Sequence, residues 1–187
     1  MGEHKSEKNA ATPWHVPVVV EQVPETGEHF DLVADVDVRV SVARLAGLRD
    51  LPRFQANFDV TRRGAGGLSV IGQVSATVGQ TCVVTLEPVA NEIEEAFDLV
   101  FVLHPTGKPR AAEGDANGEP REVKWNDPEP LIGGVIDLGA IATEFLILGL
   151  NPYPRKPGAT FQPPPNAKSD GGPFAALAKL KKDQDGR

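Results

Sequence analysis

Two runs of alternating apolar and polar residues constrain the fold of this chain more than any other feature. Residues 54–60 place an apolar side chain at every second position, and residues 68–78 repeat the pattern after the small-residue stretch 64–67. Alternation with a period of two is typical of a half-buried β-strand, because successive side chains point to opposite faces of a sheet. Four small residues between two such runs favour a turn. The sequence therefore predicts an antiparallel hairpin over residues 54–78, with its loop at 64–67.

A second region, residues 131–152, predicts the main helix. Asp137 follows a mostly apolar stretch and stands where an N-cap belongs, since its carboxylate can accept hydrogen bonds from the first free N–H groups. Glu144 falls on the polar side, and Pro152 cannot continue a helix. We therefore expect a helix over about residues 137–150, packed on the core. Residues at three- and four-residue spacing predict its buried face, made of Leu138, Ile141, Ala142, Phe145, Leu148 and Gly149.

The remaining periodic segments complete an α+β prediction. Residues 14–20 and 29–36 are candidate strands, the first at a sheet edge because it carries Pro17 and follows Pro13. Residues 38–48 fit a short helix, and residues 93–103 fit another strand after the β-branched stretch 81–86. We expect an antiparallel β-sheet with the helix near 137–150 and the short helix near 38–48 packed on it.

Composition along the chain predicts one domain with flexible ends. Residues 1–12 are polar and are expected to be disordered, and residues 13–157 are expected to form a single domain. Within that domain, residues 106–127 are rich in Gly, Pro and charge, which predicts a mobile acidic connector. Residues 158–187 are predicted to be a Pro-rich flexible tail, in which 173–182 could form a short helix.

Charge and motif content argue against several classes of function. The formal net charge is −7, whereas a general nucleic-acid binder needs clustered Lys and Arg. Residues 91–130 hold ten acidic and four basic side chains, so any RNA contact must use a local patch elsewhere. The chain lacks the common hydrolase and metalloprotease motifs. With one cysteine and no apolar run of membrane-spanning length, we expect a cytoplasmic protein that contacts neither membrane nor DNA.

A few residues are candidates for function, each with a simpler structural interpretation. Cys82 is either a reactive thiol or, as free cysteines more commonly are, a small buried hydrophobe. Tyr153, Arg155 and Lys156 follow the helix, and an aromatic beside two cations can stack on a base and hold phosphates. The alternative is a proline-stiffened exit from the helix. Arg62 and Arg63 beside the glycine turn fit ordinary solvated charges.

Two blocks of sequence resemble a known family. The first consists of GQVSATV at 72–78, CVVTLEPV at 82–89 and IEEAF at 93–97. The second runs from Ile136-Asp137-Leu138 through Glu144, Leu146 and Leu148 to Pro152. Together they resemble the YceD family, the large ribosomal RNA subunit accumulation proteins of bacteria and plastids, over residues 54–157, with a looser likeness over 14–53. The resemblance implies structural motif positions at Cys82, Asp137, Leu138, Glu144 and Pro152.

The resemblance also implies a function and, in some relatives, a metal site. It implies a role in accumulation or maturation of 23S ribosomal RNA, with no known catalytic activity. Some relatives carry further cysteines that suggest zinc, but this chain has Thr85 where the second cysteine would stand and Tyr153–Pro157 after the helix. A structural zinc site needs about four Cys or His ligands, and Cys82 is the only cysteine beside four scattered histidines. We therefore expect neither metal nor other cofactor.

These observations predict a non-catalytic, monomeric factor in 23S ribosomal RNA accumulation and large-subunit biogenesis. Its expected partner is large-subunit ribosomal RNA or a basic ribosomal or assembly protein, and whether RNA contact is direct stays open. The expected contact residues are those where the family blocks reach loops: Thr85, Glu87, Pro88, Tyr153, Arg155 and Lys156. The alternative is a small-molecule-binding or enzymatic β-rich domain unrelated to ribosomes, which would need a deep pocket lined by polar groups.

Overall fold

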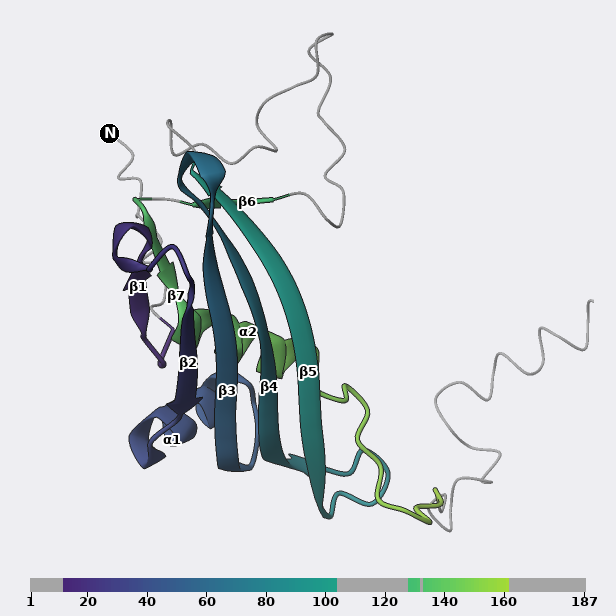
Figure 1. Cartoon of the computed structure of the whole chain (residues 1–187). Helices are drawn as coiled ribbons and strands as arrows, with labels where there is room; N and C mark the ends of the chain where they lie inside the picture. The colour runs from purple at the N-terminus through teal and green to yellow at the C-terminus, as the bar shows by residue number, and fades with distance from the viewer. Residues whose placement is uncertain (1–11, 104–127, 132, 162–187) are drawn as a thin grey trace, which may run out of the picture.

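The computed structural model describes residues 12–103, 128–131 and 133–161 and shows a curved sheet with two helices (Figure 1). The main sheet has five strands in the order β2-β3-β4-β5-β6. Their bounds are Glu28–Val33 for β2, Asp50–Arg63 for β3, Gly67–Thr81 for β4, Pro88–Leu103 for β5 and Glu129–Leu131 for β6. The α+β class predicted from the sequence is confirmed.

The predicted hairpin is present and is longer than the alternating runs indicated. β3 and β4 pair antiparallel, from Asp50 opposite Gly79 to Arg63 opposite Gly67. The 3-10 turn η2, Gly64–Gly66, joins them, and Gly66 adopts a φ of +79° that glycine tolerates without a steric penalty. The strands are longer than the alternating runs because polar residues at their ends also pair. Apolar periodicity does not predict this pairing.

One strand departs from the antiparallel prediction. β2 pairs antiparallel with β3, and β5 pairs antiparallel with β4 from Leu68 opposite Phe101 to Thr81 opposite Pro88. β6, however, runs parallel to β5, with Phe101 opposite Glu129. A parallel pair needs a crossover connection rather than a tight turn, and the long stretch between the two strands supplies that length.

A second, two-stranded sheet holds the start of the described chain. β1, Pro17–Val19, pairs antiparallel with β7, Val135–Asp137. The strand predicted over 14–20 is therefore shorter and lies outside the main sheet. It ends where the 3-10 turn η1, Val20–Gln22, begins, and the Val20 N–H donates to the Gly134 carbonyl at 2.9 Å.

Both helices start at an aspartate that caps the free N–H groups. Helix α1, Val36–Leu45, begins two residues earlier than predicted, because Asp35 Oδ1 accepts the Val38 N–H at 2.8 Å. The same cap ends β2 at Val33, three residues short of the prediction. Helix α2, Leu138–Leu148, starts after Asp137 as predicted. Among the described residues, no helix is both long enough and apolar enough to cross a membrane.

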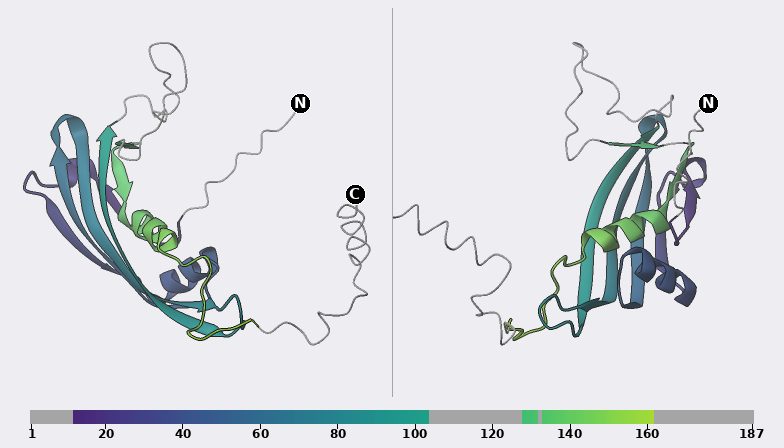
Figure 2. Two further views of the ribbon diagram at one scale, coloured as in Figure 1. Left: turned by 90° about the vertical axis from the view of Figure 1, so that its right-hand side faces the viewer. Right: turned by 180° about the vertical axis from the view of Figure 1, so that it is seen from behind.

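The core lies between the concave face of the sheet and the helices (Figure 2). Aromatic side chains join the layers: the Trp14 and Phe54 ring centroids are 4.6 Å apart, and those of Phe97 and Phe145 are 4.4 Å apart. Burial of these side chains and of the apolar β3 and β4 faces supplies the main stabilisation of the fold.

The predicted buried face of α2 was wrong in one respect. Leu148 is 68% exposed, while Leu146 is fully buried. Successive helical residues are separated by about 100°, so Leu146 continues the Leu138–Ala142 row, and Leu148 is rotated away from it. Both leucines lie at helical spacing from Leu138, and only the position of the sheet determines which of them is buried.

The tail and connector predictions fall largely outside the described residues. These are the predicted disordered segment 1–12 apart from Thr12, the connector 106–127 and the tail 158–187 beyond Phe161, with its possible helix at 173–182. Whether 13–157 forms a single domain likewise stays a prediction.

Candidate functional site

Asp137, a position in the family-like motif, connects helix α2 to the small sheet. Its Oδ1 atom accepts the N–H groups of Gly139 at 3.0 Å and Ala140 at 3.2 Å, and also the Val16 N–H at 2.8 Å. Its Oδ2 atom lies 2.5 Å from His15 Nδ1. One carboxylate therefore caps a helix and binds a segment more than a hundred residues earlier in the chain. Asp137 is a structural residue of the scaffold, as predicted for the N-cap.

Two segments that the sequence separates by more than sixty residues meet at the other end of α2. We call this surface the turn–exit junction: the turn 82–88 between β4 and β5, and the exit segment 151–161 after α2. The Val83 N–H donates to the Pro154 carbonyl at 2.9 Å, and Gln80 Nε2 donates to the Asn151 carbonyl at 2.9 Å. Figures 1 and 2 show the exit segment running beside the turn at the end of the sheet. The two predicted contact regions therefore form one continuous surface.

The turn is held in a specific shape by its own backbone. The Cys82 N–H donates to the Glu87 carbonyl at 2.8 Å, and the Leu86 N–H donates to the Cys82 carbonyl at 2.9 Å. Leu86 adopts a φ of +60°, a left-handed conformation that costs a non-glycine residue on the order of 1 kcal/mol or more. This conformation holds an exposed leucine on the surface of the junction.

Cys82 is buried beneath the junction, which agrees with the structural interpretation of this residue. Its sulfur accepts the Lys156 N–H at 3.3 Å and the Thr85 N–H at 3.4 Å. These donors, that of Lys156 first, lower the pKa of the Cys82 thiol from 9.0 to about 6. This contact could not be predicted from local sequence, because Lys156 is 74 residues away from Cys82. Cys82 thus fixes the exit segment against the turn.

Glu87 and Lys156 form an ion pair across the junction. Lys156 Nζ lies 3.0 Å from Glu87 Oε2, with both side chains about half exposed. The hydrogen bond from Lys156 holds the pKa of the Glu87 carboxyl below its usual range. Lys156 was predicted as an available cation, but this pairing partly neutralises it. Arg155 is exposed beside it.

Exposed hydrophobic side chains lie on the same two segments as the ion pair. Leu86 is 75% exposed, Tyr153 70% and Phe161 73%, and Val83 also reaches the surface. An open groove of about 520 Å³ lies between the two segments. Its lining residues are Val84, Thr85, Glu87, Lys156, Pro157, Gly158, Ala159, Thr160 and Phe161. Exposed apolar side chains in one place are typical of a contact surface.

Three of the exposed hydrophobic residues, Val83, Leu86 and Phe161, were not predicted from the sequence. Leu86 lies within a quoted motif but carried no signal of exposure, since leucine is usually buried. Phe161 stands alone among polar and proline residues, and an isolated aromatic in such a stretch was the one available indication. The candidate surface is thus more apolar than a purely cationic phosphate contact.

The other named positions lie around the junction or away from it. Pro88 opens β5 opposite Thr81, is exposed and does not line the groove. Pro152 follows the end of α2, and Glu144 is exposed on that helix. Arg62 and Arg63 lie at the opposite end of β3, so they do not join the junction. Among the residues that the structure describes, no three His, Cys, Asp or Glu side chains are grouped to hold a metal ion.

The convex face of the sheet is acidic. Asp59 on β3 pairs with Ile71 on β4, and Ile71 pairs with Asp98 on β5. Ser75 on β4 pairs with Glu94 on β5. Two basic groups on this face are paired with carboxylates: Arg53 Nη2 lies 2.7 Å from Glu92 Oε2, and His29 lies between Asp31 and Asp59. The phosphates of a nucleic acid would be repelled by this face.

Comparison with known proteins gives one finding about the family. The family model described as "Large ribosomal RNA subunit accumulation protein YceD" matches residues 70–181, more than half of the chain. No curated protein and no solved structure matches the chain. The matched region includes both segments of the junction and all of α2.

Proposed function

Because this chain belongs to the YceD family, we propose that it is a non-catalytic factor in 23S ribosomal RNA accumulation and large-subunit biogenesis. It acts in the cytoplasm, with the ribosome, by binding immature large-subunit particles through the turn–exit junction. The contact is with large-subunit RNA or with a basic ribosomal protein bound to it.

One observation favours the turn–exit junction as the contact surface. The two family-like blocks are far apart in the sequence, yet their loops meet through the Val83–Pro154 and Cys82–Lys156 hydrogen bonds. A scaffold alone does not require an exposed Leu86 in a left-handed conformation beside exposed Tyr153 and Phe161. A strained backbone conformation such as that of Leu86 persists only where the surrounding structure holds it, and such conformations are often found at binding sites.

The chemistry of the junction suits either partner. Tyr153 offers a flat face for stacking on an unpaired base, and Arg155 offers a planar group for a phosphate. The same aromatic and apolar groups can pack against a protein, with Glu87 facing a basic side chain. The overall charge of −7 favours a local contact over broad coating of RNA.

Site-specific photo-crosslinking distinguishes these partners. The full chain carrying a benzophenone amino acid in place of Tyr153 is expressed in growing cells, and the crosslinked products are identified in particles separated on sucrose gradients. We expect crosslinks to precursor large-subunit RNA or to a large-subunit protein. The same amino acid at Ile71, exposed on the acidic face, is the control.

The outcome decides the proposal in both directions. Crosslinks from position 153 but not from position 71, in fractions that contain immature large subunits, support the junction as the contact surface. Equal crosslinking from both positions, or crosslinks only to components unrelated to the large subunit, would contradict it.

A further inference from the structure

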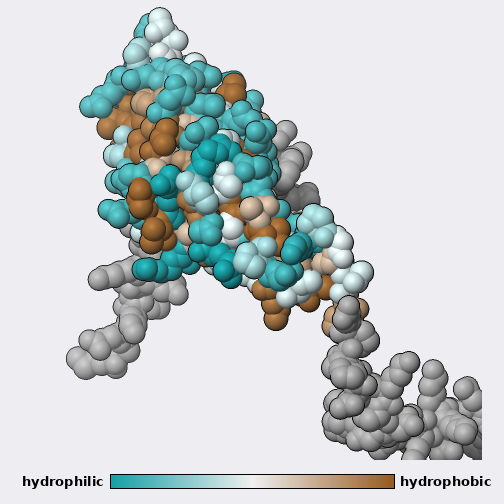
Figure 3. Space-filling view, turned by 90° about the horizontal axis from the view of Figure 1, so that it is seen from below, coloured by the Kyte–Doolittle hydropathy of each residue, from teal (hydrophilic) through white to brown (hydrophobic). Residues whose placement is uncertain are grey.

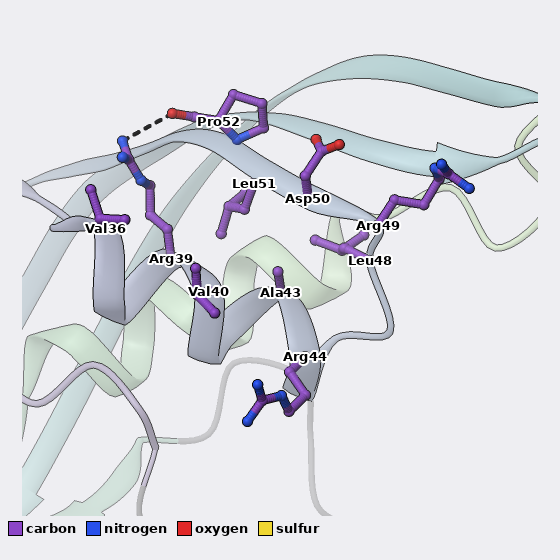
Figure 4. Close-up of a pocket in the computed structure, with 10 residues that line it drawn as sticks. All are labelled: Val36, Arg39, Val40, Ala43, Arg44, Leu48, Arg49, Asp50, Leu51 and Pro52. Carbon is purple, nitrogen blue, oxygen red and sulfur yellow. Dashed lines mark hydrogen bonds between the residues drawn. The ribbon is translucent and has the colours of Figure 1, made fainter.

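A second groove lies between helix α1 and the start of β3. We call it the α1 groove. It has a volume of about 480 Å³, within the range of ligand-binding clefts. Figure 4 shows its apolar wall on the helix side, made of Val36, Val40 and Ala43, and Leu48 and Leu51 facing them. None of its lining residues lines the junction groove.

The helix side of this groove is apolar yet exposed. Val36 is 62% exposed and Val40 is 54% exposed. With Ala43, which is itself buried, they stand at i, i+4 and i+7, the spacing of one helix face. Figure 3, which shows the molecule from below, shows hydrophobic patches separated by hydrophilic surface on this side. A helix stripe left uncovered in this way is suited to pack against a further segment.

The lining of the groove is basic, although the chain as a whole is acidic. Its lining contains Arg39, Arg44 and Arg49 and only one carboxylate, Asp50, in a protein of net charge −7. Arg39 Nη1 donates to the Pro52 carbonyl at 2.9 Å, which fixes one guanidinium at one end of the groove and leaves its other donors available. In Figure 4, Arg49 lies at the other end, and the Asp50 carboxylate points away from the helix.

From this arrangement we propose that the α1 groove binds an acidic amphipathic segment of a partner protein. The apolar stripe accepts aliphatic side chains at helical spacing, as in other helix-in-groove contacts. The arginines at the ends select Asp and Glu on either side of those side chains, because guanidinium and carboxylate pair with two parallel hydrogen bonds.

The same features disfavour two other occupants. The lining contains no aromatic side chain, whereas binding of single-stranded RNA relies on aromatic stacking. A second copy of the chain on a two-fold axis would place the same three arginines against one another, and like charges oppose such a contact.

A peptide-display selection tests the proposal with a defined probe. The purified full chain is used to select from a library of random peptides of about 16 residues, long enough for an amphipathic helix. Enriched peptides are synthesised, and their dissociation constants are measured by fluorescence anisotropy. We expect peptides with apolar residues at i, i+3 or i+4, and i+7, flanked by Asp or Glu. Val40→Glu is expected to weaken their binding by about tenfold or more, because a carboxylate then lies in the groove.

A second variant and two matched controls separate binding from folding. Arg44→Glu/Arg49→Glu reverses two exposed charges and leaves the apolar stripe intact, and it should weaken binding by a similar factor. Val33→Glu introduces the same change at an exposed valine outside the groove, and Arg62→Glu/Arg63→Glu reverses two arginines at the far end of β3. Both controls should bind within about twofold of the original chain, and circular dichroism checks that every variant is folded.

Three results would overturn the proposal. The first is a selection that yields no peptide sensitive to Val40→Glu, or only basic peptides. The second is binding of a 12-nucleotide single-stranded RNA that Arg44→Glu/Arg49→Glu abolishes, with no acidic peptide bound. The third is a dimer of the full chain in sedimentation that Val40→Glu dissociates.

Discussion

The backbone N–H of Lys156 donates to the sulfur of Cys82 at 3.3 Å, across 74 residues of sequence. This bond joins the end of the α2 exit to the start of the β4–β5 turn. Together with the Val83–Pro154 bond, it makes one surface from two loops.

Stability should depend on the ionisation of Cys82. The thiol pKa is lowered from 9.0 to about 6 in the folded chain, so folding favours the thiolate. The resulting stabilisation is complete above pH 9, decreases as pH falls and is absent below pH 6. Cys82→Ser keeps a hydrogen-bond acceptor but does not titrate. Urea unfolding at several pH values should show the difference between the two proteins growing from pH 6 to pH 9, and a constant difference would contradict this.

Asp137 should contribute more to stability than an ordinary N-cap. Asp137→Ala removes two cap bonds to α2 and leaves the Val16 N–H without its acceptor, so we expect a loss of about 2–3 kcal/mol. Asp35→Ala, which removes a single cap bond to Val38, is the matched control and should cost about 1 kcal/mol. Equal losses in urea unfolding would show that the Val16 contact adds nothing.

Gly139→Ala should destabilise the protein although alanine is the better helix former. A Cβ atom at position 139 would lie 2.6 Å from the Trp14 carbonyl oxygen, so backbone must shift, at a cost of about 1–3 kcal/mol. Gly64→Ala, at a site with open space, should change stability by no more than about 1 kcal/mol. A Gly139→Ala chain with an unchanged melting temperature would show that the segment at Trp14 adapts freely.

The exposed charges of the junction should matter for binding and little for stability. Arg155→Ala/Lys156→Ala breaks the exposed pair with Glu87, which contributes at most about 1 kcal/mol. It should reduce cosedimentation of the chain with immature large subunits, because Arg155 and Tyr153 are both exposed on the exit segment of this surface. Arg62→Ala/Arg63→Ala, an adjacent basic pair at the far end of β3, should leave cosedimentation unchanged. Similar cosedimentation by both variants would place the contact elsewhere.

The sequence was sufficient to predict the elements whose determinants are local. The alternation over 54–60 and 68–78 predicted the hairpin, and Asp137 with its following apolar residues predicted the start of α2. These predictions depend on side-chain period and capping, which neighbouring residues set. The family resemblance was also confirmed, since its motifs are contiguous strings.

What the sequence missed depends on contacts between distant segments. The parallel pairing of β6 and the two-stranded sheet of β1 and β7 need partners that no local pattern specifies. Leu148 was predicted to be buried but is exposed, and Leu146 is buried instead, because packing against the sheet determines which side of α2 is covered. The candidate contact residues were predicted in two separate loops. Only the structure shows that the two loops meet at Cys82, that Glu87 pairs with Lys156, and that Leu86 is exposed.

The most direct test of the account is the ratio of 23S to 16S ribosomal RNA in cells that lack this gene. We expect a lower ratio in the deletion strain, full restoration by the original gene or by Arg62→Ala/Arg63→Ala, and partial restoration by Arg155→Ala/Lys156→Ala. Full restoration by the last variant would leave the ribosomal role standing and reject the junction as its surface. An unchanged ratio in the deletion strain would contradict the ribosomal role itself.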